Sequence, residues 1–523
     1  MSFTQHSTFL TIKIYLLLYA VSLQFVSMAQ ESSGPLPILM FTTQTSIDSF
    51  FLANEGITTL DAEVIIYDLI DTQDPIINLD GFGNITTIKG RLDLSFIANI
   101  TDLSGFSNLD SICAQLIISG DVGFKDFSGL SSLRHVSAVH LIETSGISTF
   151  KGLENITELA NFLSIQNSPI DSLEGLQNVT SVGNIFFVND MGLNIPNLNG
   201  LRGLEKVNFG FTIIGSATQP NLIKFDGLDN IGFIGKSIKI ENVEQAEDVH
   251  FLSALSKING DLTLRNAKNI SLEGLSNIDS VIGSMIISDI STTSDLSELQ
   301  KLEYIEEDFN VSGLNSLESL EGLKRLNSVK GHLFIGFNKI LEDITSLSNL
   351  DHEDLSEITI RSNSTLDACS VSSICEFLSS GKPATIFNNG AGCNSFEEIV
   401  DKCSSIAIAK IQVRLDLNEN GQIDPGEPFY RDALISVNPG NSLFNPNTQN
   451  EGTIVLEVDT NYVFTFEETN NPFWQAIDMS QFITPQNGVI DTLVFIVTAQ
   501  SSVSEAEVDI LSLIHISEPT RPY

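Results

Sequence analysis

The chain has 523 residues, and its 66 acidic residues against 26 basic ones give a formal net charge of −40. A polyanion of this kind repels nucleic acids and anionic membrane surfaces, which excludes both as expected partners. The hydrophobic share of 42% is ordinary for a globular protein and excludes an acidic disordered chain.

Residues 1–29 have the layout of a secretory signal peptide. Lys13 precedes an apolar run from Ile14 to Val26, and the small residues of Ser27-Met28-Ala29 form a cleavage site. The run is short for a membrane-spanning helix, and an uncleaved anchor is the alternative. We therefore expect a secreted or cell-surface protein, with no membrane insertion after cleavage.

A repeat of about 24 residues fills the middle of the chain. The first feature that recurs in it is a Leu-x-Gly-Leu block. Examples are Leu173-Glu174-Gly175-Leu176 and Leu320-Glu321-Gly322-Leu323. The glycine of the block recurs at Gly81, Gly105, Gly129, Gly152, Gly175, Gly200, Gly227, Gly274 and Gly322.

About ten residues after each block comes an apolar-x-apolar triplet, which predicts a short strand with one buried face. The triplets are Leu92/Leu94, Leu116/Ile118, Val139/Leu141, Leu163/Ile165, Ile185/Phe187, Phe211/Ile213, Ile238/Ile240, Leu262/Leu264, Met285/Ile287, Phe309/Val311, Leu333/Ile335 and Ile358/Ile360. Val64/Ile66 is an opening copy.

One such coil is too small to fold alone. Burying four or five apolar side chains gains about 1.5–3 kcal/mol each, whereas ordering the backbone costs about 1–2 kcal/mol per residue. Stacked coils cover one another's apolar sides and turn the triplets into a long parallel sheet. The glycines allow corners where the backbone turns tightly or approaches a neighbour. We therefore predict a mainly β solenoid rather than pairs of helices.

The pattern L-x-x-L-x-G-L-x-N-[IV]-x-x-[IV]-x-G-x-L-x-I resembles the receptor L-domain type of leucine-rich repeat, especially its secreted bacterial versions. The resemblance implies a right-handed parallel β-solenoid of about 12 turns over residues 79–360. Residues 30–78 resemble the opening cap of such proteins, and residues 361–403 resemble the closing cap. Members of this family resemble one another as binding scaffolds with diverse ligands.

The middle residue of each triplet points away from the buried face, and most of these residues are polar, as exposure requires. Phe186 and Phe334 are apolar, and Phe162 and Val188 fall on the same face beside Phe186. An exposed aromatic cluster predicts a contact patch for a protein or glycan ligand. The alternative is that a loop or the next domain covers the rings. The middle residues are Asp93, Ile117, His140, Ser164, Phe186, Thr212, Lys239, Thr263, Ile286, Asn310, Phe334 and Thr359.

Four cysteines, Cys369, Cys375, Cys393 and Cys403, fall within the predicted closing cap. In an exported protein they predict two local disulfides, and the sequence leaves three connectivities open. A zinc site is the weaker alternative, because no CxxC pair or nearby histidine completes a ligand set. Cys113 stands alone beside apolar residues and is predicted to be a buried thiol.

Asn-x-Ser/Thr triplets recur along the chain and would be glycosylation acceptors in a eukaryotic secretory protein. The alternative, which we favour, is that they follow from the Asn-Ile/Val-Thr step of the repeat itself. The triplets begin at Asn84, Asn99, Asn155, Asn178, Asn269, Asn310 and Asn363.

Residues 404–500 contain strand-like runs separated by turns rich in Gly, Pro and Asn, which predicts a small β-sandwich. Between the first two runs lies D-x-N-x-N-G-x-x-D-x-x-E, the ligand spacing of a calcium loop. Its flanks are strands, so an ordinary EF-hand is not expected, and the segment resembles the B-type repeat domains of bacterial surface adhesins. We predict a structural Ca²⁺, with a metal-free acidic turn as the alternative. The predicted ligands are Asp416, Asn418, Asn420, the Gln422 carbonyl, Asp424 and Glu427.

Residues 511–523 match no strand, cap or repeat, and they read as the translation of a sequencing adapter. We exclude them from the fold. On this interpretation a natural C-terminal segment is missing, together with any sorting signal or further domain.

No phosphate loop, HExxH motif or nucleophile elbow occurs in the sequence, so we expect a protein without enzymatic activity. The leading hypothesis is a recognition or adhesion protein that binds a protein or glycan through the solenoid sheet. One alternative is a structural spacer that presents a missing C-terminal domain. A less favoured alternative is a β-helix carbohydrate-active enzyme.

Overall fold

The structure is a computed structural model that describes residues 35–68, 73–188, 195–216, 224–243, 245–403, 406–430, 433–439, 442–444, 452–467, 474–486 and 490–499. The predicted signal peptide and residues 511–523 lie outside these ranges. The fold is mainly β, with 35% strand against 13% helix, as the sequence predicts. The chain forms two compact units, Met1–Ile147 with Lys151–Ile156, and Ser148–Phe150 with Thr157–Tyr523.

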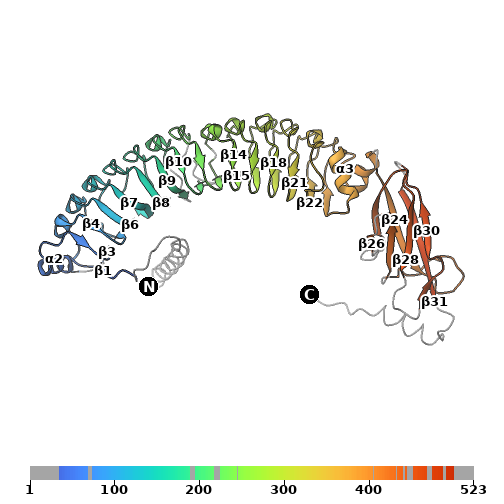
Figure 1. The fold of residues 1–523 in the computed structure, drawn as a ribbon, viewed down its shortest axis with the longest axis horizontal. Coiled ribbons are helices and arrows are strands. Elements are labelled where there is room, and N and C mark those ends of the chain that lie inside the picture. The colour runs from blue at the N-terminus through green and yellow to red at the C-terminus, as the bar shows by residue number, and fades with distance from the viewer. Residues whose placement is uncertain are drawn as a thin grey trace, which may run out of the picture. The chain divides into compact units, whose positions relative to one another are not determined.

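The first unit is a stack of coils whose strands pair in parallel (Figure 1). The register places Leu92 opposite Leu116 and Leu116 opposite Val139, so the predicted triplets align. Both apolar residues of each triplet are buried. The elements are β1 (Ile38–Phe41), α2 (Gln44–Ala53), β2 (Thr59–Leu60), β3 (Glu63–Tyr67), η1 (Asp80–Asn84), β4 (Thr87–Ile88), β5 (Leu92–Ser95), η2 (Ser104–Phe106), β6 (Ser111–Asp121), η3 (Ser128–Leu130) and β7 (His135–Ser145).

The coils of the second unit repeat this arrangement over a longer stretch. Leu163, Ile185, Phe211 and each later first triplet residue are in register as far as Ile358, which pairs with Ala384 in the predicted closing cap. The main sheet contains β8 (Glu158–Gln166), β9 (Ser181–Val188), β10 (Lys206–Val207), β11 (Phe211–Ile214), β12 (Phe233–Ile234), β13 (Ile238–Glu241), β15 (Leu262–Arg265), β17 (Met285–Ser288), β19 (Phe309–Ser312), β21 (His332–Gly336), β22 (Glu357–Arg361) and β23 (Ala384–Phe387).

Shorter elements complete these coils. A second, four-stranded parallel sheet is formed by β14 (Lys257–Ile258), β16 (Ser280–Val281), β18 (Tyr304–Ile305) and β20 (Ser328–Val329). Short 3₁₀ turns form at the Leu-x-Gly-Leu blocks of Gly200 and Gly274 and at glycine-free segments in the equivalent place of other coils, a detail that apolar spacing alone does not predict. These turns are η4 (Asn199–Leu201), η5 (His250–Ala254), η6 (Glu273–Leu275), η7 (Ser297–Leu299) and η8 (Thr345–Leu347).

The block glycines lie where one coil packs directly against the next. A Cβ atom on Gly274 would stand 1.8 Å from the carbonyl oxygen of Val249 in the preceding coil. Gly322 makes the same approach to Leu296 and also has a φ of +107°, which L side chains rarely adopt. Close approach between coils therefore accounts for Gly274 and Gly322, whereas the coils of Glu298 and Ser346 accept a larger residue at the equivalent position.

The block asparagine ties each coil to the one before it. The Nδ2 group of Asn277 donates a hydrogen bond of 2.8 Å to the carbonyl oxygen of Ser253. Asn108, Asn155, Asn230 and Asn349 donate equivalent bonds to backbone carbonyls 24 to 28 residues earlier. These side chains satisfy backbone oxygens that the short strands leave over.

Deeply buried asparagines line the coils that approach the closing cap. Asn338 and Asn363 are fully buried, and Asn363 Oδ1 accepts from the backbone N–H of Asn338 at 3.1 Å. Asn363 Nδ2 donates to the Ile335 carbonyl at 3.0 Å, and Asn389 Oδ1 accepts from the backbone N–H of Asn363 at 3.1 Å. Because its side chain is enclosed and bonded, Asn363 is not an acceptor for glycosylation in the folded protein.

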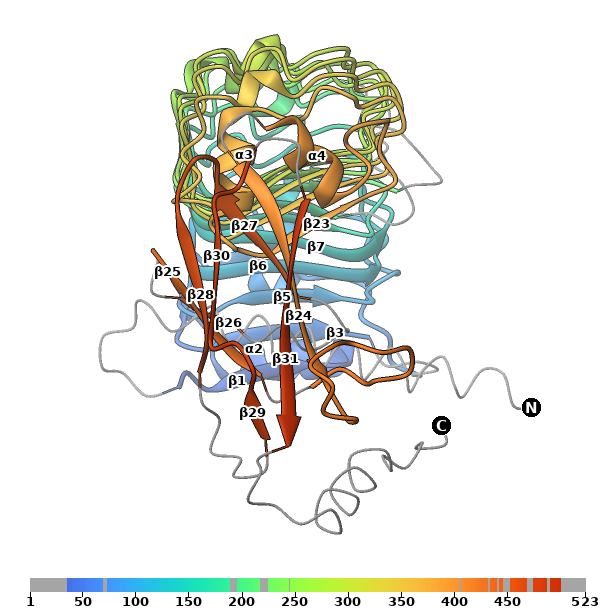
Figure 2. The ribbon, with the colours of Figure 1, turned by 90° about the vertical axis from the view of Figure 1, so that its right-hand side faces the viewer.

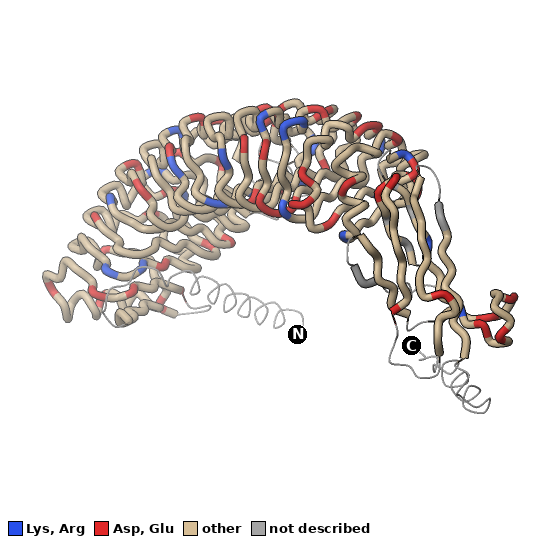
Figure 3. The backbone as a smooth tube through the Cα atoms, turned by 45° about the vertical axis from the view of Figure 1, so that its right-hand side comes forward, with Lys and Arg blue, Asp and Glu red and all other residues tan. Residues whose placement is uncertain are grey.

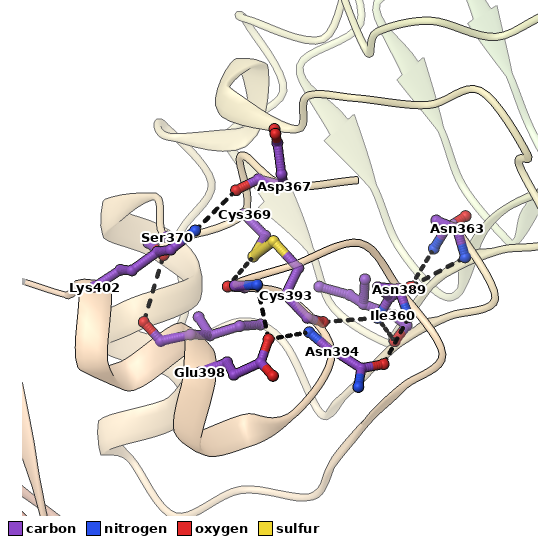
Figure 4. Close-up of a disulfide and its surroundings, with 12 residues drawn as sticks. Ile360, Asn363, Asp367, Cys369, Ser370, Asn389, Cys393, Asn394, Glu398 and Lys402 are labelled. Atoms are coloured by element: carbon purple, nitrogen blue, oxygen red, sulfur yellow. Dashed lines mark hydrogen bonds between the residues drawn. A yellow bond between two sulfur atoms is a disulfide. The ribbon is translucent and has the colours of Figure 1, made fainter. Parts of the chain in front are cut away.

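The predicted closing cap contains two disulfides, as expected. Figure 4 shows the one between Cys369 and Cys393. Cys369 pairs with Cys393 and Cys375 pairs with Cys403, which selects one of the three connectivities. Next to them, α3 (Ser372–Ser379) and α4 (Phe396–Lys402) contact each other, and α4 contacts β23 (Figure 2). Two disulfides of this kind indicate an oxidising, extracellular-type environment.

Cys113 is exposed, so the prediction of a buried thiol is wrong. The register between β6 and β7 shifts between Ile112 and Gln115. Ile112, Leu116 and Ile118 are buried, so period-two alternation along β6 already places Cys113 on the opposite, outward side.

The C-terminal part of the second unit contains two four-stranded sheets with a common core. One sheet has the order β27-β24-β31-β29, and the other has the order β26-β25-β28-β30 (Figure 2). Phe464 of one sheet and Phe495 of the other are fully buried in this core. The strands are β24 (Ile406–Leu415), β25 (Leu434–Asn438), β26 (Ser442–Phe444), β27 (Gly452–Glu457), β28 (Tyr462–Glu467), β29 (Trp474–Ala476), β30 (Ser480–Ile483) and β31 (Ile490–Ala499).

Among the residues described by the structure, no helix combines the length and the apolar character required to cross a bilayer.

Candidate functional site

The outward face of the sheet is less exposed than the sequence predicts. Ser164, Thr263 and Thr359 are buried, and Phe186 and Phe334 are half-buried. Neighbouring strands lie about 4.8 Å apart, so outward side chains of successive coils cover one another. The polar character of this face therefore reflects hydrogen bonding between coils as well as contact with water.

The four predicted patch residues lie in two places. Phe162 belongs to β8 and both Phe186 and Val188 belong to β9, where Ser164 pairs with Phe186. Phe334 belongs to β21, and strands β11, β13, β15, β17 and β19 lie between β9 and β21. At about 4.8 Å per strand the separation is roughly 29 Å. The structure therefore contains a first patch (Phe162, Phe186, Val188) and a separate second patch around Phe334.

The second patch surrounds an arginine. The guanidinium carbon of Arg361 lies 5.3 Å from the Phe334 ring centroid, 4.8 Å from that of Phe337 and 5.8 Å from that of Phe387. Phe337 and Phe387 are 47% and 38% exposed. We call Phe334, Phe337, Arg361 and Phe387 the arginine–phenylalanine cluster.

The backbone explains how these side chains meet. Phe334 pairs with Thr359, and Gly336 pairs with Arg361, which in turn pairs with Phe387. A Cβ on Gly336 would lie 2.7 Å from the Phe334 ring, so the glycine provides the space into which the ring leans. Phe337 follows the strand with a φ of 60°, which directs its ring toward the same arginine.

Sequence reasoning missed Arg361, Phe337 and Phe387. Arg361 lies two residues after Thr359, so extending the period-two alternation by one step places it on the outward face. Phe337 lies beyond the end of its strand at a left-handed backbone position, where the alternation gives no information.

In the first unit the same face contains buried titratable groups. Ser95 Oγ donates to Asp93 Oδ1 at 2.5 Å and lies 2.7 Å from Ser119 Oγ. Burial raises the pKa of the Asp93 carboxyl above its usual value, although the Ser95 hydroxyl and the Arg91 charge oppose this. Burial lowers the pKa of the His140 imidazole from 6.5 to about 4. At neutral pH His140 is therefore uncharged.

The predicted calcium loop brings several of its oxygen-bearing side chains together. Asn418 Nδ2 and Asn420 Nδ2 lie 2.7 and 2.6 Å from Asp424 Oδ2. Asp416 is 1% exposed, and its Oδ2 accepts from the Gly421 amide at 2.7 Å. Gly421 has a φ of +76°, the sharp turn that glycine is expected to make at this position.

Glu427 closes the loop at its other end. Its Oε1 accepts from the Leu417 amide at 2.9 Å, and its Oε2 accepts from the Asp424 amide at 2.8 Å. Within the described ranges, no three His, Cys, Asp or Glu side chains gather closely enough to hold a metal ion without rearrangement. The oxygen donors fit a hard cation only if the carboxylate of Glu427 and the two amides turn toward a common centre.

Figure 3 shows acidic and basic positions interspersed along the backbone of the coils, with acidic positions the more frequent.

A scan against models of known protein families finds no match to this chain. A search of curated proteins finds no significant relative.

Proposed function

We propose that the chain is a secreted or cell-surface recognition protein that binds a protein or glycan through the outward face of its parallel sheet. The observation that carries the proposal is the placement of half-exposed aromatic rings in two patches on a face built from successive coils. Aromatic side chains supply large contact areas at low entropic cost, and such patches on soluble proteins are typical of binding sites.

The repeat pattern and the parallel pairing support assignment to the receptor L-domain type of leucine-rich repeat, with a right-handed solenoid. The shared core of the two C-terminal sheets supports a β-sandwich resembling the B-type domains of bacterial adhesins. Scaffolds of these kinds present surfaces and lack the polar reaction centre expected of a carbohydrate-active enzyme, so we favour binding over catalysis.

Replacing the rings tests the proposal. Thr212 and Thr263 stand in other coils at the middle triplet position that Phe186 and Phe334 occupy in theirs. The substitutions Phe186→Thr and Phe334→Thr should therefore be compatible with the strand conformation. Binding of the secreted protein to cells, and to protein and glycan arrays, should fall about tenfold or more with unchanged thermal unfolding. Phe209→Thr removes a ring that is 44% exposed outside these strands and is the control.

If both ring variants and the control bind equally well, the sheet face is not a recognition surface. That result would favour the alternative of a spacer that holds another domain away from the cell.

We further propose that the loop of residues 416–427 holds a structural Ca²⁺. Asp416, Asn418, Asn420, Asp424, Glu427 and the Gln422 carbonyl would provide the oxygen ligands. The cation would offset the negative charge of Asp416, Asp424 and Glu427 in a chain of net charge −40.

Calcium should raise the unfolding temperature of the C-terminal part of the full chain. Saturation at 100 times Kd adds about 2.7 kcal/mol to the free energy of unfolding. Asp424→Ala should abolish the effect, whereas Asp459→Ala, which replaces an acidic residue outside the loop, should retain it. Equal unfolding temperatures in calcium and in chelator would remove the proposal.

A further inference from the structure

Arg361 differs from the other arginines whose side chains the structure describes. Each of the others has an ion pair or a side-chain hydrogen bond: Arg91, Arg134, Arg202, Arg265, Arg325 and Arg414. Within the described ranges Arg361 has neither, and its Nε atom, like that of Arg414, is buried without a hydrogen bond. Arg202 and Arg414 also have no ion pair with a described carboxylate, but their guanidinium groups donate to backbone carbonyl oxygens, whereas Arg361 has no acceptor of either kind among the described residues.

The surroundings hold this guanidinium in place. Ring contacts from Phe334, Phe337 and Phe387 restrict the side chain, and attraction to the ring faces partly compensates its lost hydration. A guanidinium fixed in this way loses little entropy on binding, and its planar fork matches the two oxygens of a carboxylate.

Aromatic rings surround the arginine, and polar side chains lie farther along the same strands. Phe337 and Phe387 keep exposed ring surface on which the C–H face of a sugar can lie. On the neighbouring strands, Thr385 is exposed and His332 Nε2 lies 2.9 Å from Thr359 Oγ1. These side chains can exchange hydrogen bonds with sugar hydroxyls.

The sheet itself argues against an acidic peptide. Strands β21, β22 and β23 pair with one another along their length, so their backbone groups are not available to a peptide strand. A peptide with several carboxylates would meet a single arginine in a strongly acidic chain. A ligand with one carboxylate on a ring suits one cation beside aromatic surfaces.

We propose that the arginine–phenylalanine cluster binds a sugar ring bearing a single carboxylate, with the carboxylate on Arg361 and the ring against Phe337 and Phe387. The inference rests on the proposed recognition function and names the ligand class for its second patch.

The proposed binding of an acidic sugar can be tested by calorimetric and saturation-transfer NMR titrations of the full chain. The probe is the methyl glycoside of N-acetylneuraminic acid. The acid should bind about tenfold or more tightly than its methyl ester, and added salt should weaken its binding. N-acetylglucosamine tests the ring without the charge, and acetate tests the charge without the ring. Both should bind more weakly than the acidic sugar.

Two variants and one control locate the binding. Arg361→Gln should remove the preference for the acid over the ester. Phe337→Asn should weaken binding of both sugars while suiting the left-handed backbone, since asparagine occupies comparable positions at Asn242 and Asn266. Arg325→Gln removes the same charge from an arginine paired with Glu303 and should leave binding unchanged. Thermal unfolding of each variant distinguishes loss of binding from loss of folding. If Arg361→Gln does not fold, Arg361→Lys is the substitute, because it keeps the charge and removes the planar fork.

Equal affinity for the acid and the ester, or acid binding that survives Arg361→Gln, would overturn the inference. Acetate binding as strong as that of the sugar would reduce the cluster to a simple anion site and overturn the sugar assignment. In either case, sensitivity of array or cell binding to Phe186→Thr would still support the recognition function, so the two proposals can fail separately.

Discussion

The coils and the C-terminal sheets bury similar apolar side chains but connect them differently. In the coils each triplet packs against triplets about 24 residues away in sequence, as Leu262 pairs with Met285. In the C-terminal sheets one core joins residues as distant as Ala409 and Val497. Damage to a coil should therefore stay near that coil, whereas damage to the C-terminal core should affect all of its strands.

The largest effect is expected from Phe464→Ala. Phe464 is fully buried in the C-terminal core, and its truncation should cost about 3–5 kcal/mol. Urea unfolding followed by the fluorescence of Trp474, the single tryptophan of the chain, should show early loss of the C-terminal sheets. Far-ultraviolet circular dichroism should still report the coils. A simultaneous loss of both signals would contradict the separation between the two regions.

Reduction of the two disulfides should destabilise the coils rather than the C-terminal sheets. Each disulfide closes a loop of 24 or 28 residues, and its removal should cost about 3–4 kcal/mol. Because every cysteine lies at or before position 403, a reductant should destabilise the coils and leave the tryptophan transition in place. The double variant Cys375→Ser/Cys403→Ser should reproduce part of this shift without reductant. Movement of the tryptophan transition alone would be the opposite of what we expect.

Acidification should weaken the first unit through His140. Its folded pKa of about 4 lies below the ordinary value of 6.5, so the unfolded chain binds the proton first as the pH falls. Stability is complete above pH 6.5 and is lost progressively toward pH 4, by at most about 3 kcal/mol. His140→Asn should flatten this part of the stability profile, measured by urea unfolding between pH 7.5 and pH 4. Asp93 acts in the opposite sense, because its raised pKa favours the folded state at low pH.

The smallest of these effects is expected from Gly274→Ala, at about 1–3 kcal/mol. The added methyl group would meet the Val249 carbonyl and separate two coils. Gly232→Ala is the matched control, because nothing lies within 4 Å of its Cβ position. Thermal unfolding should distinguish the two alanines, and equal stability would show that the coils can move apart without penalty.

Most of the coil architecture could be predicted because the apolar spacing repeats. Within each unit the triplets are buried and in register, from Leu92/Leu94 to Val139/Leu141 in the first and from Leu163/Ile165 to Ile358/Ile360 in the second, since period-two burial depends only on neighbouring residues. The connectivity of the four cysteines could not be predicted, because it depends on how α3 and α4 fold against the last coil. The block asparagine was visible in the repeat pattern, but its bond to the preceding coil depends on stacking.

The outward face was harder to predict than the buried one. Alternation places Phe334 and Phe186 on that face correctly, but it contains no information about the strands between them. The arginine–phenylalanine cluster combines three coils, and Phe337 reaches it through a backbone turn rather than through a strand position. Such a cluster becomes visible only when the register and the strand ends are both known.

The asparagine bonds also bear on how the length of this protein can change. The Asn277 side-chain amide reaches the Ser253 carbonyl, one coil away, and the same contact recurs at Asn108, Asn155, Asn230 and Asn349. A whole coil can therefore be duplicated or deleted with the new neighbours offering one another the same donor and acceptor. A partial deletion would offset donor from acceptor, so we expect natural variation in this chain to proceed in complete coils.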